Sequence, residues 1–363
     1  RVVTITTLQD NGGTGDGGDD SVTVTIAATV TVANLNDAPT VANAINNQAV
    51  NEDATLDFTF NANVFSDADS GDSCTYTSTQ TDGSALPGWL TFTAGDRNYG
   101  GTPLNANVGT LSVRLTCTDG SSAAVNDDFD IVISNTNDAP TTSGGSATPN
   151  EDATHTFTTT ASDWGYSDPD SDTLVSIDFT TLPGTGTLRY NNADVSAGDD
   201  IALANLGGVT YVPVANANGA VTFTFKVYDG TVLSSAGTFT LTYQAVNDAP
   251  VNTLGTPNAV NEDTANAITG NSIADVDDTS MTSVAITASR GTFSLAQTTS
   301  LTFAAGDGTD DATMTFSGTV TNINSAIATL TWTSASNDDA DATITVVTTD
   351  DEGGADTDSM SIT

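Results

Sequence analysis

The chain has 363 residues, of which 46 are acidic and only 6 are basic, so its formal net charge is −40. This imbalance argues against nucleic acid and anionic membranes as partners, because like charges repel. Hydrophobic residues make up 37% of the sequence, enough for packed cores rather than a disordered acidic tail, and no apolar stretch is long enough to span a bilayer.

The first 35 residues read as the last hairpin of an incomplete β-sandwich, with two strands around an Asp10–Asp20 loop. The segment opens directly on a strand pattern without the features of a signal peptide, so we expect a piece of a longer or processed polypeptide. An isolated hairpin is marginal in water. We expect strands of preceding chain, or else of a neighbouring copy, to cover the apolar face formed by Val22, Val24, Ile26, Val30 and Val32.

The rest of the chain alternates apolar and polar residues with a period of two, as in Leu111–Leu115, Val221–Phe225 and Ala342–Val346. Because Thr and Val favour strands and helical periodicity is nearly absent, we predict an all-β protein with antiparallel strands. A repeat of about 100 residues is the size of an immunoglobulin-like sandwich of some seven strands. The predicted domains are 36–136, 137–246 and 247–363, and the last stops within its final strand.

Two short phrases recur in the same order at intervals of about a hundred residues, which indicates a tandem array. Asn-Asp-Ala-Pro begins at Asn36, Asn137 and Asn247, and Asn-Glu-Asp begins at Asn51, Asn150 and Asn261.

Two further acidic signals follow in each domain. An Asp-x-Asp phrase, with another Asp soon after it, occurs at Asp67-Ala68-Asp69 with Asp72, at Asp168-Pro169-Asp170 with Asp172, and at Asp275-Val276-Asp277 with Asp278. A later loop carries Asp119, Asp229 or Asp350-Asp351. In extended backbone, residues i and i+2 point to the same side, so two carboxylates can converge on one cation. Oxygen-only ligands select a hard cation, and Ca²⁺ tolerates irregular coordination better than Mg²⁺ does.

Each phrase taken singly is more often a turn or a solvated loop than a metal site. Four acidic signals in the same order in three domains favour calcium at the joints, where Asn-Glu-Asp of one domain, the Asn-Asp linker and two loops of the next domain meet. The predicted ligands are Asn36, Asp37, Asp67, Asp69 and Asp119; Glu52, Asp53, Asn137, Asp138, Asp168, Asp170 and Asp229; Glu151, Asp152, Asn247, Asp248, Asp275, Asp277 and Asp350; and Glu262.

These residues resemble the cadherin-like repeats of calcium-dependent adhesion proteins, including long bacterial surface adhesins. Residues 40–136 are similar to the dystroglycan-type subgroup through Leu86-Pro87-Gly88-Trp89-Leu90 and Gly101-Thr102-Pro103, and residues 141–246 resemble a bacterial repeat through Gly186-Thr187-Leu188. The resemblance implies immunoglobulin-like (cadherin-like) sandwiches in a linear array with Ca²⁺ at each joint. The second Asn of the animal linker is Ala here, so the number of ions per joint stays open.

Other conspicuous residues point to structure rather than catalysis. Cys74 and Cys117 fall on strands expected to be neighbours, which favours a disulfide over two buried thiols. His155 reads as a surface strand residue, and Trp89, Trp164 and Trp332 as core or edge packing. A hydrolase has one special carboxylate pair, whereas these acids recur in every domain.

We therefore expect a non-enzymatic, secreted or surface-anchored protein whose repeats form a calcium-stiffened extender of a large microbial adhesin. Its expected partners are Ca²⁺, neighbouring repeats or other copies of itself, and a cell-surface or polysaccharide ligand. One alternative is a filament subunit whose incomplete first sandwich is completed by strands of another copy. Another is a carbohydrate-binding or hydrolytic module of a secreted enzyme.

Overall fold

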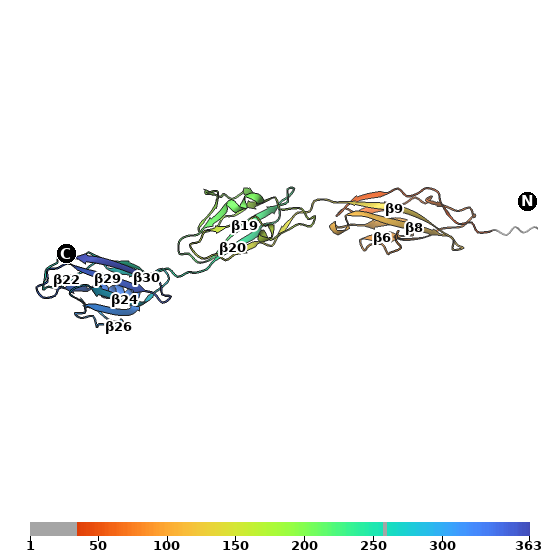
Figure 1. Cartoon of the computed structure of the whole chain (residues 1–363). Coiled ribbons are helices and arrows are strands. Elements are labelled where there is room, and N and C mark those ends of the chain that lie inside the picture. Colours follow the sequence, from red (N-terminus) through yellow and green to blue (C-terminus); the bar gives the residue numbers. More distant parts are fainter. Residues whose placement is uncertain (1–34, 257–259) are drawn as a thin grey trace, which may run out of the picture. The chain divides into compact units, whose positions relative to one another are not determined.

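The computed structural model describes residues 35–256 and 260–363, which form three β-sandwiches (Figure 1). The predicted hairpin at residues 1–35 therefore lies outside the described residues, apart from Leu35. The chain divides into two compact units, residues 1–136 and 137–363. The first unit contains the first sandwich, and the second unit contains the second and third.

The first sandwich packs a four-stranded sheet, ordered β2-β9-β8-β5, against a three-stranded sheet, ordered β3-β7-β6. A short β1-β4 pair lies beside them. The long β8–β9 hairpin contains the predicted strand Leu111–Leu115. The strands are β1 Thr40–Val41, β2 Gln48–Asn51, β3 Leu56–Thr59, β4 Phe65–Ser66, β5 Thr75–Gln80, β6 Leu90–Thr93, β7 Asn98–Gly101, β8 Gly109–Thr118 and β9 Ala124–Ser134, with a 3₁₀ turn at Asn105–Asn107.

The second sandwich has the same plan, with sheets ordered β11-β20-β19-β14-β17 and β12-β18-β15-β16 and a short β10-β13 pair. Its strands are β10 Thr141–Thr142, β11 Gly145–Ala147, β12 His155–Thr156, β13 Tyr166–Ser167, β14 Ser176–Phe179, β15 Thr187–Tyr190, β16 Ala193–Asp194, β17 Asp199–Ala202, β18 Val209–Val212, β19 Gly219–Tyr228 and β20 Gly237–Tyr243. Two 3₁₀ turns lie at Ala161–Trp164 and Leu203–Gly208.

The third sandwich has sheets ordered β26-β27-β24-β29-β30 and β22-β28-β25, with a short β21-β23 pair. Strand β30 pairs with β29 from Ala355 to Ile362. The strands are β21 Val251–Thr253, β22 Asn266–Ala267, β23 Ser272–Ala274, β24 Ser280–Ala288, β25 Thr292–Leu295, β26 Thr302–Ala305, β27 Thr313–Thr319, β28 Leu330–Thr333, β29 Ala342–Thr349 and β30 Ala355–Ile362.

The expectation of antiparallel pairing throughout is wrong at one place in each of the first two sandwiches. Strand β2 runs parallel to β9, and β11 runs parallel to β20. No hairpin joins these strands, because they come from opposite ends of their domain, so no tight turn imposes an antiparallel direction. This parallel pair brings the segment after β2 or β11 to the end of the sandwich where the last strand, β9 or β20, finishes.

A single α-helix, α1 at Val320–Ile327, interrupts the β pattern in the described part of the third sandwich. Thr319 caps it, since its Oγ1 accepts a hydrogen bond from the Asn322 N–H. Ile323, Ala326 and Ile327 are buried at helical spacing against the core. Eight residues are too few for a clear periodic signal, which is why the sequence did not predict this helix.

Each sandwich has its own core, and the alternation seen in the sequence matches burial. Trp164 and Trp332 are buried and Trp89 is half-buried, which confirms their expected packing role. Cys74 and Cys117 form the predicted disulfide. His155 is half-buried rather than on the surface, because its ring packs against Phe157 and Phe239.

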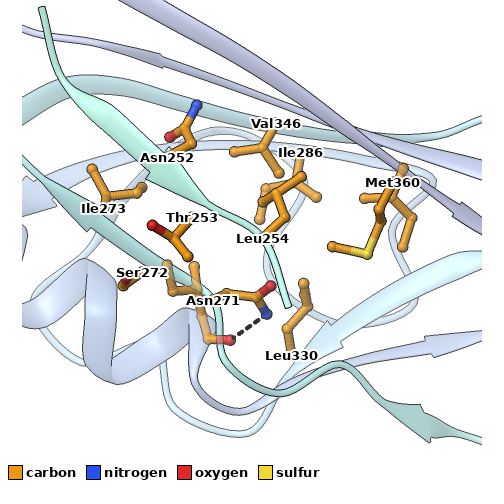
Figure 2. A pocket seen from close by; sticks show the side chains of 12 residues that line it. Asn252, Thr253, Leu254, Asn271, Ser272, Ile273, Ile286, Leu330, Val346 and Met360 are labelled. Carbon is orange, nitrogen blue, oxygen red and sulfur yellow. Dashed lines mark hydrogen bonds between the residues drawn. The ribbon is translucent and has the colours of Figure 1, made fainter. Parts of the chain in front are cut away.

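A narrow crevice enters the core of the third sandwich between β21, β23 and β30 (Figure 2). Leu254, Ile286, Val346 and Met360 line it, and Asn271 donates through Nδ2 to the Ile327 carbonyl at 3.4 Å. No titratable side chain lines this crevice. The crevice is therefore part of the core, and the acidic side chains that could bind a metal lie at the ends of the sandwiches.

Candidate metal centre

The predicted residues of the linker, of Asp-x-Asp and of the later loop gather at the end of each sandwich where the Asn-Asp linker enters, which we call the linker end. There, the linker asparagine donates through Nδ2 to Oδ2 of the later-loop aspartate in all three sandwiches. The donor–acceptor distances are 3.0 Å for Asn36 and Asp119, 3.1 Å for Asn137 and Asp229, and 2.8 Å for Asn247 and Asp350. The linker is thus anchored in the same way three times.

The next linker residue makes a second repeated contact. Its backbone N–H donates to Oδ2 of the second aspartate of Asp-x-Asp: Asp37 to Asp69 at 2.7 Å, Asp138 to Asp170 at 2.6 Å and Asp248 to Asp277 at 2.7 Å. Within each Asp-x-Asp, the first carboxylate accepts the N–H of the second residue at 2.8 to 2.9 Å. One carboxylate of the pair therefore holds its own loop and the other holds the linker.

The later-loop aspartates Asp119, Asp229 and Asp350 are buried, with 7%, 8% and 1% of their surface exposed. Their Oδ1 atoms accept loop N–H groups, from Ser121 and Ala123, from Thr231 and Val232, and from Gly354 respectively. These bonds hold the aspartates in fixed positions.

Hydrogen bonding also favours the charged form of two of these aspartates. The hydrogen bond from Asn36 is the main cause of a lowered pKa at Asp119. Burial pushes the pKa of Asp229 upward, but hydrogen bonds from Val232, Asn137 and Thr231 outweigh it, and its pKa is lowered too. Both groups are therefore ready-made anionic ligands.

Carboxylate oxygens converge at each linker end. Atoms of Asp67, Asp72 and Asp119 lie within 4.8 Å of one another, and the same holds for Asp168, Asp170 and Asp172 and for Asp275, Asp278 and Asp350. Oxygens bound to one Ca²⁺ lie about 2.3 to 2.6 Å from the ion, so oxygens this close to one another can share a cation.

Each cluster contains a carboxylate oxygen that is buried without a hydrogen-bond partner in the described structure. In all three cases Oδ2 of the first Asp-x-Asp residue is such an atom, in Asp67, Asp168 and Asp275, and the third cluster also contains Oδ2 of Asp278. Burying a carboxylate oxygen without a partner costs free energy. The same unpartnered Oδ2 atom in all three sandwiches is consistent with a cation-binding site.

The third sandwich carries additional acids at its linker end. Atoms of Asp278, Asp351 and Glu352 also lie within 4.8 Å of one another. Hydrogen bonding to Asp351 raises the pKa of Asp278 and raises that of Glu352 to about 7. Glu352 was not among the predicted ligands, because the corresponding loops of the other two sandwiches have no acid at this place.

The predicted glutamates lie at the opposite end, where the last strand of each sandwich finishes. Glu52 and Glu151 are buried, with 2% and 5% of their surface exposed. Oε1 of Glu52 accepts the Thr136 N–H at 2.8 Å, and Oε1 of Glu151 accepts the Val246 N–H at 2.7 Å. In both residues, Oε2 is buried without a hydrogen-bond partner. This half of each carboxylate is available to a cation.

Within the second unit, Glu151 lies close to the linker that follows its sandwich. Burial is the main cause of a raised pKa at Asp248, and the charges of Asp152, Asp277, Glu151 and Asp275 raise it further. Oδ2 of Asp248 is buried without a hydrogen-bond partner. Acids from the second sandwich, the linker and the third sandwich therefore lie near enough for their charges to act on Asp248.

Three predicted ligands are placed less favourably. Asp53 is exposed with a positive φ of 59°. Asp152 has the same backbone conformation, and its Oδ1 accepts the Asn216 N–H. Glu262 is exposed, unlike Glu52 and Glu151. Asp53 and Asp152 are better explained as turn residues, since Asp tolerates the left-handed region.

Residues 38–134 match the He_PIG family of Ig domains, and residues 136–244 match the cadherin-like domain family. The chain carries tandem Ig-like and cadherin-like repeats. This bears out the resemblance and the all-β array of sandwiches.

Solved structures similar to this cadherin-like array include cadherin ectodomains. Protocadherin gamma B7 domains 1–4 is 12% identical, with a TM-score of 0.45, over 90% of this chain and 76% of that one. Protocadherin gamma B2 domains 1–5 is 13% identical, with a TM-score of 0.44, over 90% and 59%. Mouse cadherin-23 EC22–24 is 16% identical, with a TM-score of 0.41, over 89% and 98%. No curated protein matches the sequence. Within the described ranges of the array, no helix is both long and apolar enough to cross a membrane.

Proposed function

We propose that this array is a non-enzymatic, extracellular structural protein in which Ca²⁺ at the joints turns a flexible string of sandwiches into a stiff extender. The observation that carries this proposal is the joint after the second sandwich, where Glu151, Asp248 and Asp275 each keep a buried carboxylate oxygen without a hydrogen-bond partner. Calcium bound at this joint would supply partners for these oxygens and reduce the repulsion between the carboxylates.

The donor set supports calcium over other metals. The clusters consist of Asp and Glu, without His or Cys, and all-oxygen sites favour hard cations. Irregular loops rather than a rigid octahedral cage hold these oxygens, which suits Ca²⁺ better than Mg²⁺. By sequence, the linkers at Asn36-Asp37 and Asn137-Asp138 carry the same residues, and we extend the proposal to them as a prediction.

The setting supports a role outside the cell. Extracellular calcium modules bind with a Kd of about 10⁻⁴ to 10⁻³ M, so they fill in external but not in cytosolic calcium. The Cys74–Cys117 disulfide fits an oxidising compartment. We propose that the array holds the adhesive part of a large microbial surface protein away from the cell. Its partners would be neighbouring repeats or other copies of itself, and the adhesive part would bind a cell-surface or polysaccharide ligand.

The two alternatives have less support. The filament alternative depends on the hairpin at residues 1–35, which lies outside the described residues except for Leu35. A sugar-binding platform needs exposed aromatic faces, whereas Trp164 and Trp332 are buried, and Nε1 of Trp332 donates to the Arg290 carbonyl. These contacts support a structural role for both tryptophans.

Calorimetric titration of the full chain with Ca²⁺ tests the proposal. We expect saturable binding with midpoints of about 10⁻⁴ to 10⁻³ M and loss of part of it in a variant with Asp275→Asn and Asp277→Asn. The matched control carries Asp339→Asn and Asp341→Asn, an exposed Asp-x-Asp outside the clusters. Equal binding by both variants would contradict a specific site at this joint.

A further inference from the structure

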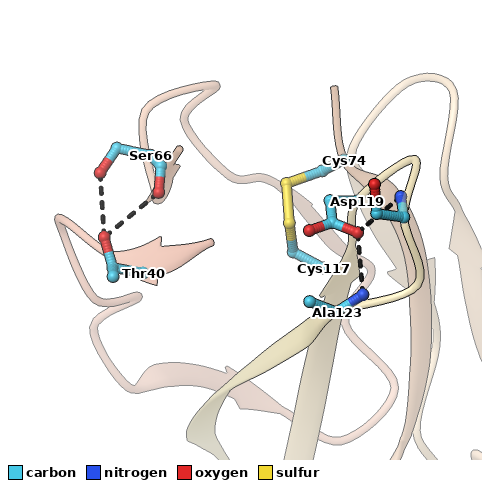
Figure 3. Close-up of a disulfide and its surroundings, with 7 residues drawn as sticks. Thr40, Ser66, Cys74, Cys117, Asp119 and Ala123 are labelled. Carbon is cyan, nitrogen blue, oxygen red and sulfur yellow. Dashed lines mark hydrogen bonds between the residues drawn. A yellow bond between two sulfur atoms is a disulfide. The ribbon is translucent and has the colours of Figure 1, made fainter. Parts of the chain in front are cut away.

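The disulfide of the first sandwich lies at its acidic cluster. Cys74 follows Asp72 by two residues, and Cys117 precedes Asp119 by two. The two Cα atoms are 5.1 Å apart. Asp67, Asp72, Cys74 and Asp119 line one cavity of about 300 Å³. Figure 3 shows the disulfide next to the Asp119 carboxylate. The crosslink therefore joins the two segments that carry the acids of this cluster.

The other two sandwiches lack this crosslink at the same register. Pairing of Thr75 with Thr118 in the first sandwich corresponds to pairing of Ser176 with Tyr228 in the second and of Ser283 with Thr349 in the third. Val175 and Val227 thus stand in place of the cysteines in the second sandwich, and Thr282 and Thr348 in the third. In the third, the Thr282 hydroxyl donates to the Asp350 carbonyl at 2.5 Å. The second and third sandwiches, which lack the disulfide, therefore serve as internal controls for the first.

The first cluster needs such a restraint. Asp72 is exposed, and its backbone hydrogen bond within the loop is long, with the Asp72 N–H donating to the Asp69 carbonyl at 3.3 Å, whereas Asp69 is held by the linker through the Asp37 N–H at 2.7 Å. Repulsion among Asp67, Asp72 and Asp119 pushes the two ligand segments apart before a cation arrives. A covalent link between the segments opposes that separation and reduces the ordering required on binding.

We propose that the Cys74–Cys117 disulfide is a positioning element for the cation site of the first sandwich and makes the calcium affinity of this sandwich, alone among the three, dependent on redox state. The inference rests on the proposed calcium function. A dithiol reductant would cleave the S–S bond, supplying two electrons and two protons to give two cysteine thiols, while the dithiol itself becomes a disulfide. Cys74 is half-exposed and Cys117 is buried, so the attack occurs at Cys74 Sγ.

Hydrogen exchange of the full chain, followed during a Ca²⁺ titration, reads out the three sandwiches separately. The variant is Cys74→Val with Cys117→Val, which copies the pair of the second sandwich and keeps the site apolar. We expect the calcium midpoint for protection of residues 119–123 to rise about tenfold, as is typical when support for metal ligands is removed. The midpoints for residues 229–232 and 350–354 should not change. The wild type treated with dithiothreitol should match the variant.

Each outcome decides the inference. An unchanged midpoint at residues 119–123 in the variant would overturn it. Loss of protection at Val113 and Ile131 in both the variant and the reduced protein would also overturn it, because the disulfide would then hold the whole sandwich rather than its ligands. Absence of calcium-dependent protection from all three sandwiches would instead contradict the proposed calcium function itself.

Discussion

Glu151 is the residue that supports the proposed role of a cation most directly. One of its carboxylate oxygens accepts the N–H of Val246, in the linker that follows β20, and the other is buried without a hydrogen-bond partner. A buried charge without a partner is costly. The same residue should therefore be unfavourable without calcium and favourable with it.

We expect Glu151→Gln to raise Tm in chelator and to lower it in millimolar calcium relative to the wild type. Glutamine keeps an acceptor for Val246 but removes the charge, an effect on the order of 1 kcal/mol or more in each direction. Thermal unfolding in both conditions measures it, with Glu262→Gln at an exposed position as control. A shift of the same sign in both conditions would contradict the account.

The single histidine should make the second sandwich sensitive to acid. Burial lowers the pKa of His155 below its ordinary value of 6.5. As pH falls through 6.5, the unfolded chain binds a proton before the folded protein does, so the free energy of unfolding decreases. This loss is absent at higher pH, where the ring is neutral in both states.

His155→Phe removes the titration and keeps a ring against Phe157 and Phe239. We expect the Tm difference between the variant and the wild type to be constant above about pH 7 and to grow in the variant's favour below about pH 6.5. Parallel Tm curves across this range would show that His155 is not responsible.

At the level of elements, features marked by a recurring sequence pattern could be predicted, whereas the pairing of strands far apart in the sequence could not. The recurring order of the Asp and Asn phrases indicated where acids would gather, because the same order occurs in three domains. The disulfide was predictable because Cys74 and Cys117 fall on strands expected to be neighbours. The parallel pairing of β2 with β9 was not predictable, since it joins segments at opposite ends of a domain. Glu352 occurs in one sandwich only, so the repeat gave no signal for it.

Helix α1 gives a local test of the third sandwich. We expect Thr319→Ala to lower its stability by about 1 kcal/mol, because the substitution removes the N-cap acceptor for Asn322. Thr321→Ala, at an exposed position inside the helix, is the matched control. Denaturant unfolding monitored through Trp332 measures both variants, and equal losses would argue against a capping role.

At the level of the whole molecule, the net charge of −40 means that the stiffness of the array should depend on bound cations. Without calcium, repulsion within each cluster and across each joint favours separation of the loops. With calcium, we expect bound ions to hold the linker and the loops together. The domain limits predicted at 36–136, 137–246 and 247–363 stay a prediction, and the joints between them are where calcium should act.

Small-angle X-ray scattering of the full chain in about 1 mM calcium and in chelator tests the central claim most directly. We predict that calcium narrows the distribution of interdomain distances while circular dichroism shows little change in β content. The variant with Asp275→Asn and Asp277→Asn should keep a hinge at Asn247 to Pro250 in calcium. Identical scattering of the wild type with and without calcium, at unchanged β content, would contradict the claim that calcium stiffens this array.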